Sequence, residues 1–309
     1  MSKAVMLKPG TQKAIDDCVD HMLADLGHPE PPLRLEDVRE LLRLDLQHYS
    51  STDVTWLQER IHEIRVAGKQ VLARPSLMLD VVKKLDLKAL VLPDRKRILV
   101  DAELPSPKQR WSEAHEITHA VLPWHDGVAM GDKAKTLSIT CHEQVETEAN
   151  YGAGQLLFLG NRFTEHLRSQ VTVNFETVKQ LKGVFGNSMT TTLWRIVENM
   201  DGPAFGMVSI HPRMQAQPGQ LAVRYFIRSR AFTEQFNHVS EMEIFAALGG
   251  FCFGRRGPIG ESDVVIHNIK QERHVFHVEC FNNYHDTLTL GIHQGIQASA
   301  VAVPHGAGL

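Results

Sequence analysis

Apolar residues recur at helical spacing in several stretches near the start of the chain. Residues 11–27 form one such stretch, which Gly27 and the prolines after it bring to an end. Residues 35–43 and about 55–68 repeat the amphipathic pattern, whereas residues 44–50 favour a short strand. This first part of the chain is therefore predicted to be mainly helical.

A hairpin followed by a helix is predicted next. Residues 88–94 and 97–104 are rich in β-forming residues and are separated by a segment suited to a tight turn. A helix then begins at Ser106, since Pro107 fits a first helical turn, and it ends near Pro123. These elements lead into the most informative motif of the chain.

The second half of the chain changes from helical to strand periodicity. Residues 126–142 read as a loop, and a long helix is predicted over 143–160. Residues 161–200 hold two or three short helices around a Gly-Asn-Ser turn, which is similar to a helix-turn-helix. After a Gly-Pro break at 201–203 the predicted elements are one helix at about 240–249 and strands at 206–212, 221–230, 263–269, 274–281 and 287–293.

Composition and charge narrow the class of protein. The 309 residues are 43% hydrophobic and 22% charged, as in an ordinary globular protein, and a net charge of −3 offers nucleic acid no basic excess. No secretory leader and no run of about 18 apolar residues is present, so we expect neither export nor membrane insertion. The four cysteines are scattered without a C-x-x-C pair. We therefore expect a cytoplasmic protein.

The segment His115-Glu116-Ile117-Thr118-His119 points to a specific chemistry. Histidines at this spacing lie on one face of a helix, so His115 and His119 can bind one metal ion. Zinc in such a site lowers the pKa of a bound water towards about 7, and Glu116 is placed to take its proton. The motif predicts a zinc-dependent hydrolase, in which Mn²⁺ or another divalent ion could replace zinc in vitro.

A catalytic zinc site needs a third protein ligand and one open position. The spacing along the chain leaves several candidates. His125 has the separation of the metzincin motif but lacks the glycine that turns the backbone. Cys141 or His142 could reach the ion from the end of the predicted loop. Glu146 or Glu148 could reach it from the next helix, since a second packed helix commonly supplies a glutamate in this class of enzyme.

The run HEITHAVL followed by ETEANYGAGQLL resembles the ImmA/IrrE metallopeptidases. In that family a second helix carries the pattern E-x-x-[AC]-N-x-x-A-x-x-L-L, and its first glutamate is the zinc ligand. The resemblance places this ligand at Glu146, followed by Ala149 and Asn150. The chain departs from the pattern at residues 158–160, where Phe-Leu-Gly replaces a proline. The departure concerns how the helix ends rather than the ligands.

The resemblance also implies an architecture and a function. The implied fold is α+β, with a small HExxH zincin (gluzincin-like) domain over 1–163, a helix-turn-helix-like segment over 164–202 and a GAF-like α/β sheet domain over 203–300. The implied activity is that of a zinc endopeptidase. Its implied substrate is an XRE-type helix-turn-helix repressor, whose cleavage derepresses stress-response or mobile-element genes.

A rival interpretation is a transcription regulator that binds a ligand or DNA and carries a structural or degenerate metal site. Glu116 argues against it, because a structural site has no use for a general base. The helices between residues 166 and 198 carry few basic side chains, so we do not expect direct DNA binding. Within the peptidase interpretation, Tyr151 or His142 could stabilise an oxyanion, although packing is the more ordinary role.

The strand-rich part also contains several histidines and two cysteines. They could form a second metal site or a sensor. Their alternation along the strands is equally that of exposed side chains. The residues concerned are His267, His274, His277, His285, His293, Cys252 and Cys280.

Overall fold

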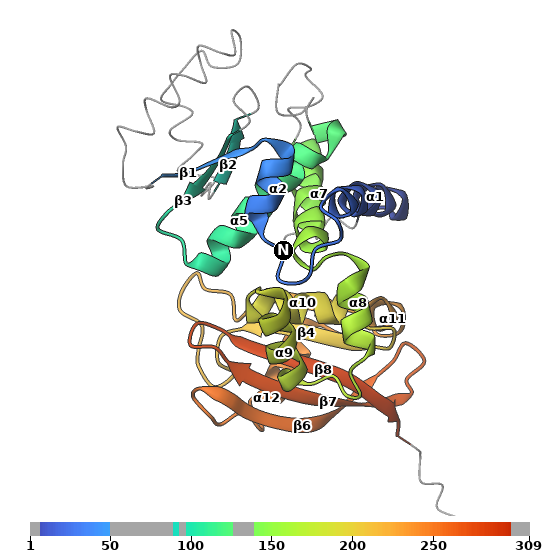
Figure 1. The fold of residues 1–309 in the computed structure, drawn as a ribbon. Helices are drawn as coiled ribbons and strands as arrows, with labels where there is room; N and C mark the ends of the chain where they lie inside the picture. The colour runs from blue at the N-terminus through green and yellow to red at the C-terminus, as the bar shows by residue number, and fades with distance from the viewer. Residues whose placement is uncertain (1–6, 50–88, 93–96, 126–138, 298–309) are drawn as a thin grey trace, which may run out of the picture. The chain divides into compact units, whose positions relative to one another are not determined.

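The computed structural model describes residues 7–49, 89–92, 97–125 and 139–297 (Figure 1). The helix predicted over residues 55–68 lies outside this part of the chain. The described elements form a mixed α+β fold, as predicted, with an antiparallel sheet in the C-terminal region.

The chain divides into two compact units. The N-terminal unit comprises Met1–Glu165 and Val184–Asn187, and the C-terminal unit comprises His166–Gly183 and Ser188–Leu309. The three ranges expected from the sequence stay a prediction: a zincin domain over 1–163, a helix-turn-helix-like segment over 164–202 and a GAF-like domain over 203–300.

Apart from the helix over residues 55–68, which is outside the described residues, the helices predicted for the N-terminal unit are present. The α-helices that the structure describes before residue 170 are α1 (Pro9–Asp25), α2 (Leu35–Leu42), α5 (Ser106–Val121), α7 (Ile139–Leu157) and α8 (Asn161–Arg168). The loop predicted over 126–142 is wrong at its end, because α7 already begins at Ile139. The β-branched Ile139 and Thr140 have low intrinsic helix propensity, and propensity is only a weak guide to a helix boundary.

A three-stranded sheet supports the motif helix. The predicted hairpin is confirmed, since β2 (Ala89–Leu92) pairs antiparallel with β3 (Arg97–Asp101). The predicted short strand β1 (Asp45–Tyr49) pairs with β3 in parallel, which gives the order β1-β3-β2. Strand β3 is buried along most of its length, and α5 packs against β2 and β3. The sheet therefore fixes the position of α5.

Helices α5 and α7 approach each other closely at Gly152. A Cβ atom at this position would lie 2.4 Å from Cγ2 of Thr118 and 3.2 Å from Cγ2 of Ile15. Thr118 cannot readily turn away, because it is buried and its Oγ1 donates a hydrogen bond to the carbonyl oxygen of Ala114 at 2.8 Å. The absence of a side chain at Gly152 thus sets the spacing of the two helices.

We expect Gly152→Ala to destabilise the protein by about 1–3 kcal/mol, because the new methyl group overpacks the contact between α5 and α7. Thermal unfolding of the metal-free protein measures the effect. Gly154→Ala is the matched control, since a Cβ there meets nothing within 4 Å. The control should be neutral or stabilising by up to about 1 kcal/mol, because alanine favours helix more than glycine does. Equal behaviour of the two variants would contradict this account of Gly152.

The five strands predicted for the C-terminal half form one antiparallel sheet in the order β5-β4-β8-β7-β6. Each predicted run overlaps one strand, although the bounds differ, most of all at β6, which begins well before its run. The strands are β4 (Ala204–Ser209), β5 (Val223–Arg228), β6 (Gly257–His267), β7 (Arg273–Asn282) and β8 (Thr287–Ile296).

Helices cover both faces of this sheet. Four helices pack on it: α9 (Phe175–Phe185), α10 (Met189–Glu198), α11 (Arg230–Gln235) and α12 (Glu241–Leu248). Successive residues of a strand point to opposite faces. Phe205 of β4 packs in a cluster with α11 and α12, whereas its neighbour Gly206 faces Leu193 and Val197 of α10. The short helices after residue 170 therefore bury their apolar sides on the sheet.

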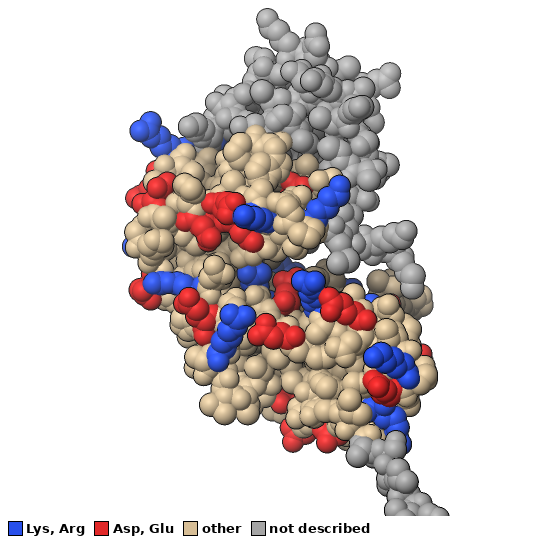
Figure 2. Space-filling view, turned by 90° about the vertical axis from the view of Figure 1, so that its right-hand side faces the viewer, with Lys and Arg blue, Asp and Glu red and all other residues tan. Residues whose placement is uncertain are grey.

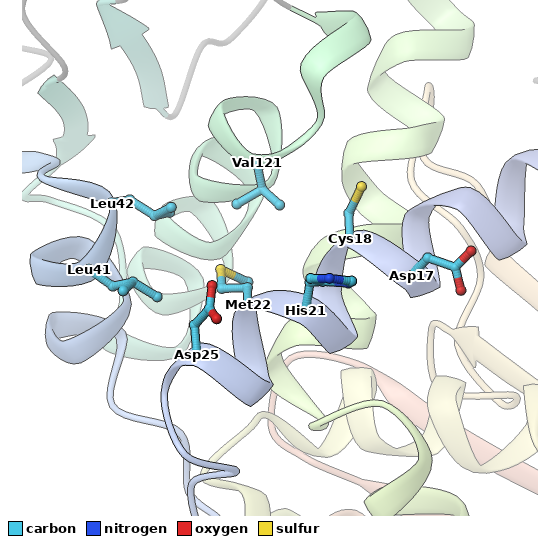
Figure 3. Close-up of a pocket in the computed structure, with 8 residues that line it drawn as sticks. All are labelled: Asp17, Cys18, His21, Met22, Asp25, Leu41, Leu42 and Val121. Atoms are coloured by element: carbon cyan, nitrogen blue, oxygen red, sulfur yellow. The ribbon is translucent and has the colours of Figure 1, made fainter.

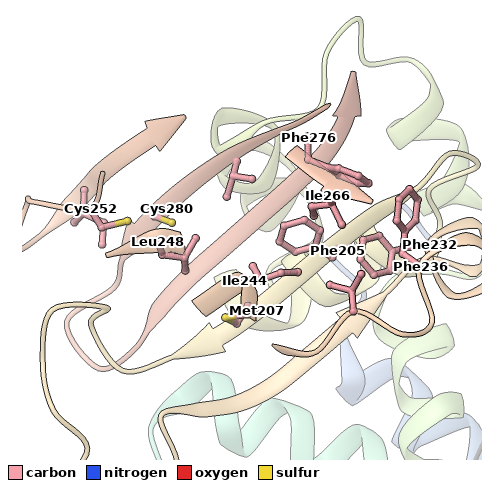
Figure 4. Close-up of a cluster of buried hydrophobic side chains, with 13 residues drawn as sticks. Phe205, Met207, Phe232, Phe236, Ile244, Leu248, Cys252, Ile266, Phe276 and Cys280 are labelled. Carbon is pink, nitrogen blue, oxygen red and sulfur yellow. The ribbon is translucent and has the colours of Figure 1, made fainter. Parts of the chain in front are cut away.

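Aromatic side chains form the centre of the core of the C-terminal unit. Phe205, Phe232, Phe236 and Phe276 are fully buried, and their rings lie 5.0–5.8 Å apart in the pairs that touch (Figure 4). Such pairs contribute roughly 0.5–1.5 kcal/mol each beyond the burial of their area.

Among the described helices of either unit, none combines the length and apolar character that a membrane crossing requires.

Candidate metal centre

Helices α5 and α7 bring the predicted ligands together. His115 and His119 lie one turn apart on α5, and their Nε2 atoms are 3.2 Å from each other. Glu146 reaches them from α7. Its Oε2 is 3.2 Å from Nε2 of His115, and its Oε1 is 3.7 Å from Nε2 of His119. Two imidazole nitrogens and one carboxylate therefore converge on one point.

The spacing of these atoms fits a bound metal ion. The three ligand atoms all lie within 4.8 Å of one another. Ligands bound at about 2.0–2.2 Å in tetrahedral geometry lie about 3.4 Å apart, which is close to the distances found here. His115, His119 and Glu146 could thus hold a divalent cation and leave a fourth position for a reactant.

Glu116 lies beside this group rather than within it. Its side chain is 8% exposed, and it is close enough to influence the ionisation of His115. Burial lowers the pKa of His115. The hydrogen bond to Glu146 and the charges of Glu116 and Glu146 outweigh this effect, so the net pKa is raised. The strong local negative charge favours a cation in place of the proton.

Asn150 orients the first histidine ligand. Its Oδ1 lies 3.1 Å from Nδ1 of His115. An amide oxygen can only accept, so Nδ1 of His115 carries the proton and Nε2 keeps the lone pair that a metal needs. The sequence contained a signal for this contact, because Asn150 follows Glu146 by one helical turn and so shares its face of α7.

His125 and Glu148, two of the alternative third ligands, lie behind the group instead of in it. Nδ1 of His125 is 3.0 Å from Nδ1 of His119, on the side of that ring away from the other ligands. Nε2 of His125 is 3.1 Å from Oε2 of Glu148. Trp124 and Gln144 also donate hydrogen bonds to Glu148, at 2.7 and 2.9 Å. The sequence singled out His125 and Glu148 as candidate ligands, but it gave no signal that they contact each other.

The environment favours a neutral His125 and an ionised Glu148. Burial lowers the pKa of His125 by more than the contact with Glu148 raises it. Burial raises the pKa of Glu148, but the hydrogen bonds from Gln144, Trp124 and His125 outweigh it, so the pKa lies below its usual value.

Of the remaining candidates from the sequence for this site, the structure describes the side chain of Tyr151 alone. The side chains of Cys141 and His142 lie outside the described part of the structure. The hydroxyl of Tyr151 donates to Oδ1 of Asp16 at 3.0 Å and accepts from Gln155 at 2.7 Å. Tyr151 thus links α7 to α1.

The C-terminal histidines and cysteines do not gather into one cluster among the described residues. Nδ1 of His274 is 2.9 Å from Nε2 of His293, and Cys252 and Cys280 lie in the apolar core (Figure 4). His277 lies instead beside carboxylates, with its Nδ1 2.9 Å from Asp263. His277 also belongs to a group with Glu261 and Glu279 whose spacing could accommodate an ion.

A cavity of about 470 Å³ lies elsewhere in the N-terminal unit, between α1, α2 and the end of α5 (Figure 3). Its lining includes Met22, Leu41 and Leu42, with Asp17 and Asp25 beside them. None of the three converging ligands lines this cavity. The cavity therefore does not mark the candidate metal centre.

Comparison with known proteins agrees with the motif. Residues 70–196 match the model of the Peptidase_M78 family, described as the IrrE N-terminal-like domain. This region is IrrE N-terminal-like. The resemblance inferred from the sequence is thus confirmed for the part of the chain that carries His115, Glu116, His119 and Glu146. The name of the matched family model suggests a metallopeptidase type of hydrolase, which fits a group of side chains able to hold a metal ion.

A solved structure of a Mycobacterium tuberculosis transcriptional regulator matches 96% of this chain and 92% of that chain, with 14% identity and a TM-score of 0.49. No curated protein matches the chain.

Proposed function

We propose that this protein is a zinc-dependent endopeptidase that cleaves an XRE-type helix-turn-helix repressor and so derepresses stress-response or mobile-element genes. The observation that carries the peptidase activity is the convergence of Nε2 of His115, Nε2 of His119 and the carboxylate of Glu146 next to the buried Glu116. The repressor as substrate rests on the family resemblance. The His₂Glu donor set matches catalytic zinc sites, which keep a position open.

The residues of the chain have separate tasks in peptide hydrolysis. A zinc ion held by His115, His119 and Glu146 would supply Lewis-acid polarisation of the scissile carbonyl and a lowered pKa for the attacking water. Glu116 accepts the proton of that water and returns it to the nitrogen of the departing amine, so the proton count balances. His115, His119 and Glu146 hold the site in place, and Asn150 fixes the ring of His115.

The C-terminal unit is assigned to substrate docking or control. We treat it as the GAF-like domain implied by the family resemblance. Its five-stranded sheet, which carries helices on both faces, supports that assignment. Acidic and basic side chains are interspersed over the described part of the face drawn in Figure 2. A mixed surface of this kind favours a protein partner over direct contact with DNA.

Cleavage of a repressor in solution tests the proposal. The full chain loaded with zinc is incubated with XRE-type repressors encoded beside its gene, and the products are separated on a gel. We expect one repressor to be cut at one position, with cleavage stopped by a chelator and restored by zinc. An unrelated helix-turn-helix protein of similar size is the control. A repressor that binds the zinc-loaded chain but stays intact would favour the non-catalytic regulator instead.

A further inference from the structure

The second ring nitrogen of His119 begins a buried polar chain. It faces Nδ1 of His125 at 3.0 Å, and Nε2 of His125 faces Oε2 of Glu148 at 3.1 Å. His125 and Glu148 are each 3% exposed. Polar groups buried this deeply need hydrogen-bond partners, and each atom in this chain has one. This series of hydrogen bonds runs from the interior of the N-terminal unit to the ring of His119, a proposed metal ligand.

The donor and acceptor roles along this chain follow from its far end. A carboxylate can only accept hydrogen bonds, so Nε2 of His125 must carry a proton and donate a hydrogen bond to Glu148. A neutral imidazole carries one donor and one acceptor, which makes Nδ1 of His125 the acceptor. Nδ1 of His119 therefore donates, and its Nε2 is left with the lone pair. This is the nitrogen that faces Glu146.

We infer that His125 and Glu148 are positioning residues that fix the tautomer and ring orientation of His119 for metal binding. The inference rests on the proposed metal centre. It gives a task to two residues that the sequence offered only as rival ligands. Without them, His119 can place its proton on either nitrogen and rotate about its side-chain bonds. Part of the binding free energy is then lost in selecting the one form that binds the metal.

The Glu148 end of the chain is itself held firmly. Trp124 donates to the same carboxylate oxygen as His125, and Gln144 donates to the other one. Three donors fix the carboxylate and hence the plane of the His125 ring. A residue that only stabilised the fold would not need to present its second nitrogen to a metal ligand. Metal affinity separates these two roles, because it is measured on the folded fraction.

Variants of His125 test the inference through metal affinity. The dissociation constant for Zn²⁺ is measured on the full chain by competition with a chromophoric chelator, and Co²⁺ absorption reports the ligand geometry. We expect His125→Leu to weaken zinc binding by about 10–100-fold, the usual effect of losing the partner behind a ligand. His125→Gln should recover much of the loss, because one amide can accept from His119 and donate to Glu148.

A double variant guards against failure to fold. His125→Leu leaves the carboxylate of Glu148 short of a partner, whereas His125→Leu combined with Glu148→Leu also removes that carboxylate. The double variant should bind zinc no more weakly than His125→Leu alone, because both substitutions interrupt the same series of hydrogen bonds behind His119. His21→Ala is the matched control. His21 lies on α1, lines the separate cavity and takes no part in the hydrogen bonds that run from His119 to Glu148, so its zinc affinity and Co²⁺ spectrum should stay close to those of the wild type.

Two results would overturn the inference. One is a folded His125→Leu protein, or its double variant, that binds zinc as tightly as the wild type. The other is equal weakening by His125→Leu and His125→Gln, which would show that shape rather than hydrogen bonding matters. Failure of the metal centre itself looks different, because His119→Ala would then also leave zinc binding unchanged.

Discussion

Glu116→Gln should retain its metal and its fold while losing peptide hydrolysis by about 10²–10⁴-fold or more. The glutamine keeps the size of the side chain and can still form hydrogen bonds, but it cannot accept a proton from water. The effect should appear in the rate of the chemical step, with little change in repressor binding. Cleavage time courses under single-turnover conditions, combined with metal analysis of the same samples, measure both quantities.

Glu113→Gln is the matched control for this variant. Glu113 lies on the same helix and forms an ion pair with Arg39, with Nε to Oε1 at 2.7 Å, outside the ligand group. Its replacement should change stability and leave the rate of cleavage close to that of the wild type. A Glu116→Gln protein that cleaves the repressor at nearly the normal rate would remove Glu116 from the mechanism.

His119→Ala should lose the metal ion. The change removes one of three protein ligands, so the fall in affinity should exceed the roughly 100-fold expected when only the partner behind a ligand is lost. Glu146→Ala should act in the same way if the third ligand lies on α7. Elemental analysis after dialysis against a weak chelator measures occupancy, and the folded state is checked by thermal unfolding.

His21→Ala provides the control for the loss of a histidine. His21 lines the cavity shown in Figure 3 and does not belong to the converging ligands. Its replacement should leave metal content unchanged. Full occupancy in His119→Ala, or equal loss in both proteins, would contradict the proposed ligand set.

Local patterns predicted the parts of the site that depend on local geometry. The spacing of His115 and His119 is enough by itself to place both rings on one side of α5, because a helix has a fixed period. The hairpin and the two main helices were also predictable, since their apolar periods and proline signals are contained within each element.

Contacts between distant elements could not be derived in this way. The spacing along the chain left His125, Glu146 and Glu148 as alternative third ligands, and the family resemblance rather than the spacing favoured Glu146. The close approach at Gly152 and the turn after Leu122 determine which of these side chains joins the proposed ligand group and which faces His119 from behind. The parallel pairing of β1 with β3 has the same cause, because no local signal identifies the partner of a strand.

The metal centre is tested most directly by anomalous diffraction from crystals of the full chain grown with zinc. Data are collected just above and just below the zinc absorption edge, and the difference locates the ion. We expect one peak in the N-terminal unit, about 2.0–2.2 Å from Nε2 of His115, Nε2 of His119 and a carboxylate oxygen of Glu146. A peak bound by His125 or Glu148, or no peak between His115 and His119, would contradict the proposed metal centre.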